Sequence, residues 1–213
     1  MATCALGRHV FSRAESLGGT QFLNEREMAA RDPNLLFDFA QQADIAQFAA
    51  MDDRVMGGTS ESGMVSLRGH AAFLGRLECE GGGFASVRAD ARGRWSLANS
   101  RGVRIRCRGD GHVFKLTVRM DGSRLDTVGY QCDFSPPNGG DGWADVDIEW
   151  QRCTPSWRGR IVPNAERLVG ERICSFGLMI SRWDDHGVPL PGAGSGPFQL
   201  DIRSVEVLRA HES

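Results

Sequence analysis

The chain has 213 residues, a formal net charge of −2 and 24% charged residues. This nearly neutral balance argues against a nucleic-acid-binding domain and gives no general attraction to an anionic membrane surface. A chain of this length can bury a core without disulfide bonds. No apolar run approaches the roughly 18 residues of a transmembrane helix, so we expect no membrane-spanning segment.

The N-terminal segment is expected to differ from the rest of the chain. Residues 1–34 are predicted to form an arm or tail, and residues 35–210 one folded domain. The first 14 residues carry Arg8, His9 and Arg13 and no acid, which faintly resembles an organelle-targeting segment, although acidic residues follow from Glu15 onward.

The domain is predicted to begin with a strand at 35–39, followed by a short helix within 41–50, where Ile45, Phe48 and Ala49 have helical spacing. Beyond this point apolar and polar residues alternate, which predicts strands with one buried and one wet face. About ten such strands with turn signals between them argue for two packed antiparallel sheets. The alternating runs lie near 73–79, 101–119, 128–134, 146–150 and 198–208.

Two strands are predicted in more detail. Residues 173–180 are almost continuously apolar, which indicates a central strand buried on both faces. In the last strand the apolar phase slips between Ile202 and Val205, which predicts a β-bulge near 203–204.

Charge also predicts a strand pairing. The run 101–119 is rich in arginine and the run 141–149 in aspartate and glutamate, so we expect neighbouring strands with opposite charges facing each other. The alternative for 101–119 is a basic nucleic-acid surface, but the run lacks interleaved aromatic residues.

Five short glycine-containing motifs follow one another along the chain. Each places glycine beside a charged or aromatic residue at the end of a predicted strand, which indicates tight backbone geometry rather than catalysis. In chain order they are Asp53–Ser60, Gly82–Arg88, Arg108–Gly111, Pro155–Arg160 and Gly196–Ile202.

The first motif has a structural and a functional interpretation. Gly57 and Gly58 are typical of a turn that needs positive φ or close backbone approach. We expect Asp53 to accept backbone N–H groups and to pair with Arg54 or another arginine, which would lock the loop. The alternative is that the loop forms part of a rim that faces a partner or ligand.

The second motif, Gly82–Arg88, lacks the lysine and the long helix of a phosphate-binding loop. We expect its glycines to let a strand bend or pass beneath an aromatic ring. Arg88, at the end of the same strand, is expected to reach a carboxylate such as Asp53 or Asp110.

The third and fourth motifs differ in what they suggest. Asp110–Gly111 between two alternating runs is typical of a β-hairpin turn. Trp157 and Arg158 look most functional, because a tryptophan beside arginine can stack, grip a carboxylate or anchor an interface. The structural alternative is that Trp157 caps the core and Arg158 satisfies a buried acid.

Residues suited to catalysis or metal binding do not group in the sequence. The five histidines are scattered, none of the six cysteines has Cys-x-x-Cys spacing, and no nucleophile motif is complete. The cysteines are expected to act as reduced, small hydrophobic residues, with a disulfide as the alternative. We therefore predict no catalytic residue, no metal and no cofactor.

Together the five motifs resemble the complex I intermediate-associated protein 30 family, from about residue 35 to 207. The resemblance implies an all-β, galactose-binding-like fold: a jelly-roll β-sandwich of two antiparallel sheets, with a short helix and an irregular N-terminal arm. The chain departs from the family pattern at 151–153 and in the loop 184–196. The positions that the resemblance marks as structural are Gly57, Gly58, Gly82, Gly83, Phe84, Arg88, Gly109, Asp110, Gly111, Gly159, Pro197 and Phe198.

The resemblance also implies a function. It indicates a non-catalytic, protein-binding assembly factor or accessory subunit of respiratory complex I or a photosynthetic complex, in a mitochondrion or chloroplast, soluble or peripheral to the membrane. The partners would be protein subunits of that complex, and no nucleic acid. The contacts are expected at Asp53, Arg54, Met56, Thr59, Trp157 and Arg158.

A different class of function remains as the alternative. A carbohydrate-binding module would present exposed aromatic side chains across a concave sheet. Most of the five tryptophans fall on predicted core positions, which weighs against it.

Overall fold

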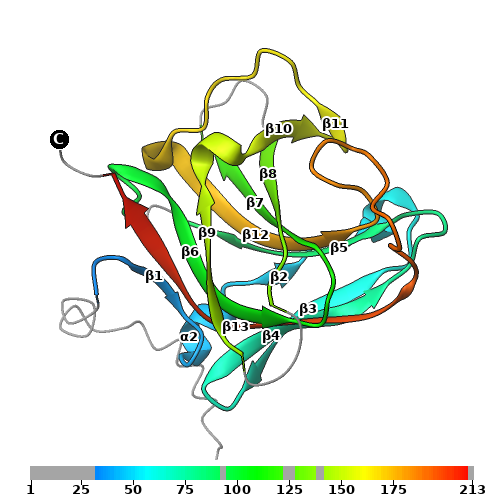
Figure 1. Cartoon of the computed structure of the whole chain (residues 1–213), viewed down its shortest axis with the longest axis horizontal. Coiled ribbons are helices and arrows are strands. Elements are labelled where there is room, and N and C mark those ends of the chain that lie inside the picture. The colour runs from blue at the N-terminus through cyan, green and yellow to red at the C-terminus, as the bar shows by residue number, and fades with distance from the viewer. Residues whose placement is uncertain (1–31, 92–94, 122–127, 138–141, 211–213) are drawn as a thin grey trace, which may run out of the picture. The chain divides into compact units, whose positions relative to one another are not determined.

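The computed structural model describes residues 32–91, 95–121, 128–137 and 142–210. These residues form thirteen strands in two antiparallel sheets, so the predicted β-sandwich is confirmed (Figure 1). Most of the expected N-terminal arm, residues 1–31, lies outside the described part.

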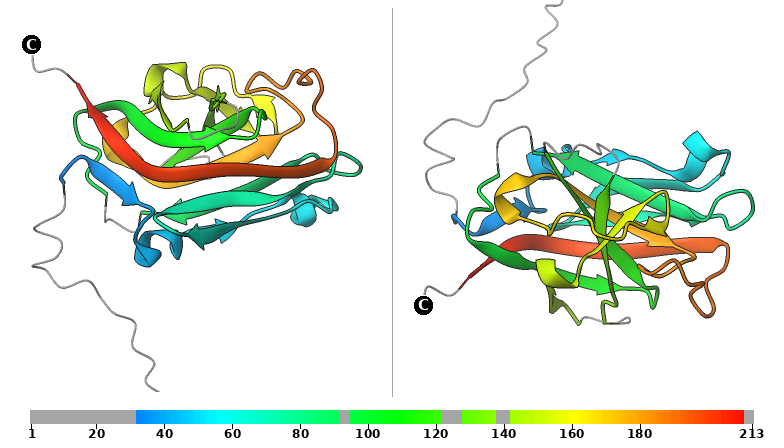
Figure 2. Two further views of the ribbon diagram at one scale, coloured as in Figure 1. Left: turned by 60° about the horizontal axis from the view of Figure 1, so that its bottom comes forward. Right: turned by 90° about the horizontal axis from the view of Figure 1, so that it is seen from above.

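The first sheet has six strands. Its order is β3-β4-β13-β6-β9, and β1 pairs with β13 beside this path. The long strand β13, red in Figure 2, pairs with three others and is the centre of this sheet. The strands are β1 (Leu35–Asp38), β3 (Glu61–Leu67), β4 (His70–Leu77), β6 (Ser100–Gly109), β9 (Ala144–Glu149) and β13 (Gly196–Arg209).

The second sheet has seven strands in the order β11-β10-β8-β7-β12-β5-β2. The central β12 pairs with both β5 and β7, as its apolar run predicts. The strands are β2 (Ala49–Ala50), β5 (Phe84–Asp90), β7 (Phe114–Met120), β8 (Gly129–Phe134), β10 (Thr154–Trp157), β11 (Arg160–Ile161) and β12 (Ile173–Ser181).

Four short helical segments connect strands. They are α2 (Gln42–Ile45), η1 (Asp53–Met56), η2 (Trp150–Arg152) and η3 (Gly170–Arg172). The helix predicted within 41–50 is thus only α2. The helix ends early because the residues after it make other contacts. The Phe48 ring packs on the Phe37 ring, with centroids 5.1 Å apart, and β2 pairs with β5.

Aromatic side chains join the two sheets in the core. Phe73 of β4 and Phe198 of β13 both contact Phe114 of β7, with ring centroids 6.2 and 6.3 Å apart. Phe37 of β1 lies 5.4 Å from Phe176 of β12. Such clusters bury large apolar areas and supply most of the drive to fold.

Strand details mostly follow the sequence. The register of β13 against β6 shifts between Ile202 and Ser204, so the predicted bulge is confirmed. The predicted pairing of basic and acidic strands is confirmed for β6, which pairs with β9, but not for the rest of the basic run, because β7 lies in the other sheet. The ion pairs between β6 and β9 are Arg101–Glu149, Arg104–Asp147 and Arg106–Asp145.

Two expectations are wrong. Asp110–Gly111 does not close a hairpin, because β6 lies in the six-stranded sheet and β7 in the other, so the turn carries the chain between sheets. The tryptophans are not mostly core residues. Among the described residues only Trp150 is buried, because the others lie at strand ends and in loops, where sequence phase says little.

Candidate functional site

The outer face of the seven-stranded sheet is the floor of a cleft of about 650 Å³. Strands β5, β12, β7 and β8 form this floor with side chains of the phase that points away from the core. The floor residues are Ser86, Arg88, Lys115, Thr117, Arg119, Gln131, Ser175 and Met179. The floor is therefore polar, with one thioether in its middle.

One wall of the cleft is the tight turn between β10 and β11. Arg158 (φ 50°) and Gly159 (φ 73°) both adopt the left-handed conformation there, which glycine accepts freely and arginine at some cost. The turn leaves Trp157 44% exposed, with Cζ of Arg158 5.0 Å from its ring centroid. The structural alternative for this pair is thus wrong: Trp157 does not cap the core, and Arg158 stacks on Trp157 instead of meeting a buried acid.

The loop after β12 lies across from this turn. Trp183, Asp184 and Gly187 line the cleft. A Cβ atom on Gly187 would lie 3.2 Å from the Gly159 carbonyl oxygen, so the loop contacts the β10–β11 turn. The Asp184 carboxylate accepts hydrogen bonds from the backbone N–H groups of His186 and Val188, which fix the loop.

The charges of the floor are unevenly neutralised. Lys115 is buried and ion-paired with Asp133, where burial raises the pKa of the Asp133 carboxyl while the Lys115 hydrogen bond acts against that rise. Arg88 lies 3.4 Å from Asp90. Arg119 makes no ion pair with any described residue, and desolvation together with the nearby charge of Arg88 lowers its pKa.

Asp53 lies outside the cleft and is fully buried. Its carboxylate accepts hydrogen bonds from the backbone N–H groups of Ser60 (3.0 Å), Gly83 (2.8 Å) and Phe84 (3.3 Å), and from the Ser60 hydroxyl (2.9 Å). Burial raises the pKa of Asp53, but these hydrogen bonds outweigh it and the net pKa is lowered. The predicted acceptance of backbone N–H groups is confirmed.

Asp52 repeats this arrangement one residue earlier. Its carboxylate accepts hydrogen bonds from the Ser62 and Ser86 backbone N–H groups, both at 2.9 Å. Since Ser62 belongs to β3 and Ser86 to β5, the two aspartates tie one edge of the six-stranded sheet to the other sheet.

The arginine partners predicted for Asp53 are wrong. Arg54 pairs with Glu61 on the exposed surface, and Arg88 reaches Asp90 instead of Asp53 or Asp110. An arginine is not needed beside Asp53, because backbone N–H groups satisfy its carboxylate. Thr59 is exposed, and the side chain of Met56 lies outside the described part.

Close packing explains why several motif positions are glycine, because a Cβ atom there would meet neighbouring atoms. A Cβ on Gly58 would lie 2.2 Å from Asp53 Cγ, and one on Gly83 would lie 2.9 Å from the Trp183 ring. At Gly83 the chain thus passes close to the Trp183 ring, as one of the two predictions for these glycines has it, and still closer to the Arg182 side chain. The third and fifth motifs are also joined: the Asp110 carboxylate accepts a hydrogen bond from the Gln199 backbone N–H at 2.6 Å.

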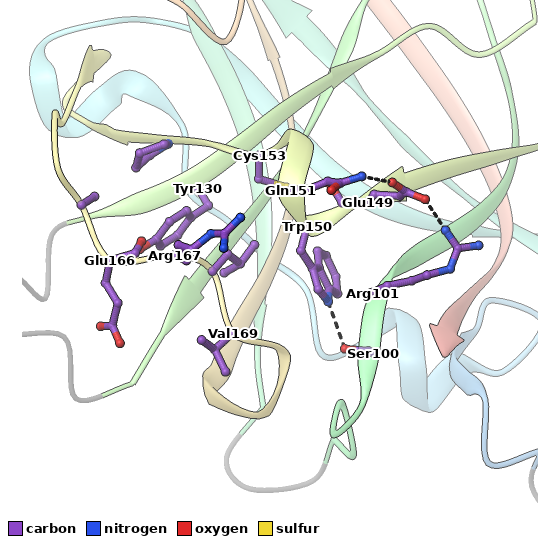
Figure 3. A pocket seen from close by; sticks show the side chains of 13 residues that line it. Ser100, Arg101, Tyr130, Glu149, Trp150, Gln151, Cys153, Glu166, Arg167 and Val169 are labelled. Carbon is purple, nitrogen blue, oxygen red and sulfur yellow. Dashed lines mark hydrogen bonds and ion pairs between the residues drawn. The ribbon is translucent and has the colours of Figure 1, made fainter. Parts of the chain in front are cut away.

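A second hollow of about 700 Å³ lies beside η2 and the segment 165–169 (Figure 3). Several of its polar side chains are paired with one another: Trp150 Nε1 donates to Ser100 Oγ at 3.0 Å, and Arg101 pairs with Glu149 through Nη1, although its buried Nε has no hydrogen-bond partner among the described residues. It offers a ligand fewer unpaired groups than the sheet cleft, which we take as the stronger candidate.

The described residues contain neither a candidate metal site nor a candidate membrane-spanning helix. No group of three or more histidine, cysteine, aspartate or glutamate side chains could hold a metal ion. None of the helices there has the length and apolar character that crossing a membrane requires.

The family model of complex I intermediate-associated protein 30 matches residues 37–202. The chain belongs to this family. The match spans all five motifs, including the aspartate and glycine residues that join the sheets and the Trp157–Arg158 wall of the cleft.

A relative of this family member is an uncharacterized protein of Schizosaccharomyces pombe. The two are 26% identical over 177 residues, which cover 76% of this chain and 77% of the relative. The likeness extends over most of both chains.

Among solved structures, the fold is similar to carbohydrate-binding modules. The family 11 module of the cellulase Lic26A-Cel5E of Clostridium thermocellum has a TM-score of 0.57 at 12% identity, over 84% of this chain and 95% of the module. A family 11 module from Clostridium thermocellum in complex with a β-1,3-1,4-mixed-linked tetrasaccharide has a TM-score of 0.56 at 14% identity, over 84% and 97%. At such identity the likeness shows the fold alone.

The structure divides the predicted contact residues. Trp157 and Arg158 line the cleft, whereas Asp53, Arg54 and Thr59 belong to the loop at the sheet edge and do not. Sequence reasoning missed Arg119, Thr117 and Met179 as site residues. The alternation of the sequence predicts that these side chains point away from the core. It does not predict which outward sheet face the neighbouring loops enclose to form a cleft.

Proposed function

We propose that this chain is a non-catalytic, protein-binding assembly factor or accessory subunit of respiratory complex I, acting in the mitochondrion, and that the sheet cleft is its docking surface. Family membership supports the complex I assignment over a photosynthetic complex. In this proposal the loop 53–59 has a structural role, and Trp157 and Arg158 contact the partner.

The distribution of exposed apolar side chains carries the proposal of a protein partner. Six large apolar side chains of the described residues are exposed, and four of them lie at or beside the cleft. Met51 and Trp157 line it, Ile161 pairs with the cleft residue Ser156, and Val188 follows the cleft residue Gly187. Apolar side chains gathered on one surface are typical of protein interfaces.

Replacing the wall of the cleft tests this proposal. Tagged chain carrying Trp157→Ala and Arg158→Ala is expressed in the native source and recovered by affinity purification. We expect it to remain folded and to lose co-purification of complex I subunits, because an anchoring tryptophan and arginine contribute strongly to binding.

The matched control is Leu67→Ala with Arg68→Ala. These residues are also an exposed apolar side chain followed by an arginine, but they lie at the end of β3 and in the turn to β4, in the six-stranded sheet and its connection. We expect this variant to co-purify complex I subunits normally. Undiminished co-purification with the Trp157 and Arg158 variant would refute the cleft as docking surface, and absence of complex I subunits from the wild-type sample would refute the partner.

A carbohydrate-binding function is the second candidate, because the cleft combines Trp157 and Trp183 with a floor that carries hydroxyl groups. The aliphatic side chains of Met51, Ile161 and Val188 fit protein side chains better than sugar rings. Titration calorimetry with a β-1,3-1,4-mixed-linked tetrasaccharide separates the two. Micromolar binding that disappears in Trp157→Ala would favour the carbohydrate.

A further inference from the structure

We infer that the sheet cleft binds an acidic polypeptide segment of its partner, with Arg88 and Arg119 gripping a carboxylate on the floor. This inference rests on the proposed protein-binding function and names the chemistry of the partner. Three features of the cleft support it: its excess of positive charge, the arrangement of the two arginines, and the apolar side chains along its rim.

The cleft is basic although the chain is not. Its lining contains five basic residues and one acidic residue, whereas the whole chain has 25 basic and 27 acidic residues. The acidic residue, Asp184, is already occupied by backbone N–H groups. Among the described residues Arg119, Arg158 and Arg160 make no ion pair. A charge excess of this kind attracts an anionic partner and orients it on approach.

Arg88 and Arg119 lie close to each other over small residues of the floor, beside Asp90, which is opposite Ser175 and 3.4 Å from Arg88. Arg88 lies opposite Gly177, and Arg119 lies opposite Ser175, so both arginines flank the central strand β12 at neighbouring positions of the outward face. Gly177 has no side chain and Ser175 a short one. Desolvation, and after it the nearby positive charge of Arg88, lowers the pKa of Arg119, while the charge of Asp90 acts against this shift.

Two guanidinium groups over a small-residue floor suit a carboxylate. Each guanidinium presents a planar fork of N–H donors that matches the two carboxylate oxygens. The hydroxyl of Thr117, which lies opposite Gly177 on the other side, has no hydrogen-bond partner among the described residues and can donate to the same group. A carboxylate bound here would also relieve the repulsion between the arginines.

The rim decides between a peptide and a smaller anion. Met51, Trp157, Ile161 and Val188 would remain in water if the cleft held only an inorganic ion. A polypeptide with both acidic and apolar side chains covers them and neutralises the floor at once, so its binding gains from area as well as from charge.

The test uses a fluorescein-labelled peptide of alternating glutamate and leucine, and a second peptide with glutamine in place of glutamate. Fluorescence anisotropy with the full chain measures the affinity of each. We expect the glutamate peptide to bind at least tenfold more tightly than the glutamine peptide, about tenfold being the loss of one charged contact. Added salt should weaken the glutamate peptide alone.

Variants locate the binding. Arg88→Gln and Arg119→Gln are each expected to weaken the glutamate peptide about tenfold. Arg119→Lys, which keeps the charge and loses the fork, should restore part of the affinity. Arg68→Gln, at an exposed arginine in the turn between β3 and β4, should change nothing. Circular dichroism establishes that each variant is folded.

Equal affinity for the two peptides, or no binding of either, would overturn the inference. Loss of affinity in Arg68→Gln as large as in Arg119→Gln would also overturn it, because it would show non-specific attraction. These outcomes leave the proposed function standing if the Trp157 and Arg158 variant still loses complex I subunits, so the two failures can be told apart.

Discussion

A Cβ atom on Gly82 would lie 2.0 Å from Oδ2 of Asp53. Gly58 is held against the same carboxylate from its own motif. The first two motifs, which lie about 30 residues apart in the sequence, therefore act together. Their glycines enclose the Asp53 carboxylate, which links Ser60, just before β3, to Gly83, just before β5. These contacts fix one edge of the six-stranded sheet to the seven-stranded sheet, whose outer face carries the cleft.

Removing the charge of Asp53 should weaken the whole domain. In Asp53→Asn an amide NH2 group faces donors that need an acceptor, so we expect the free energy of unfolding to fall by about 2–4 kcal/mol. Urea unfolding measures it. Asp145→Asn, which removes one partner of a half-exposed ion pair, should cost less than about 1 kcal/mol. Equal losses in the two variants would contradict the central role of Asp53.

Filling the space at Gly82 should have a similar effect by a steric route. Gly82→Ala pushes the Asp53 carboxylate from its donors, and we expect a loss of about 1–3 kcal/mol. Gly63→Ala is the matched control, because a Cβ there meets nothing within 4 Å. It should be neutral or slightly stabilising. Thermal unfolding followed by circular dichroism compares the two, and a stable Gly82→Ala protein would argue against the enclosure.

The lowered pKa of Asp53 predicts a pH dependence of stability. Because the folded-state pKa lies below the usual value of 3.8, the charged form stabilises the fold above that pH, and the contribution is lost as the pH falls through the folded-state value. We expect Asp53→Asn to lose less stability than the wild type on acidification through this window. Parallel pH profiles for the two proteins would show that Asp53 contributes nothing.

Cys107 is expected to resist modification in the folded protein. It is buried, and burial raises the pKa of its thiol to about 12, so almost no thiolate is present near neutral pH. Iodoacetamide treatment followed by mass spectrometry should leave Cys107 unmodified in buffer and modify it in urea. Rapid labelling in buffer would show that the core around β6 opens easily.

Much of the frame could be predicted from strand patterns. Period-two alternation gave the sheets, the phase slip near Ile202 gave the bulge in β13, and opposite charges gave the β6–β9 pairing. The hairpin at Asp110 was mispredicted because a local turn signal does not say to which sheet the next strand belongs. That choice depends on packing between Phe114 and the aromatic residues of the other sheet.

The site was harder to predict than the frame. Trp157 and Arg158 stood out because a tryptophan beside arginine can stack, grip a carboxylate or anchor an interface. Arg119 looked like any outward strand residue, because only the fold places it beside Arg88 and under the wall formed by 157–160. Asp53 was predicted to bind a partner as well as backbone, and its burial in the structure limits it to the second role.

Site-specific photo-cross-linking in cells of the native source tests the docking surface most directly. A benzoyl-bearing aromatic residue replaces Trp157 in one sample and Leu67, on the opposite sheet, in another. We expect cross-links to a complex I subunit from position 157, mapped by mass spectrometry to an acidic segment, and none from position 67. Cross-links to complex I from position 67 alone would contradict the assignment of the cleft.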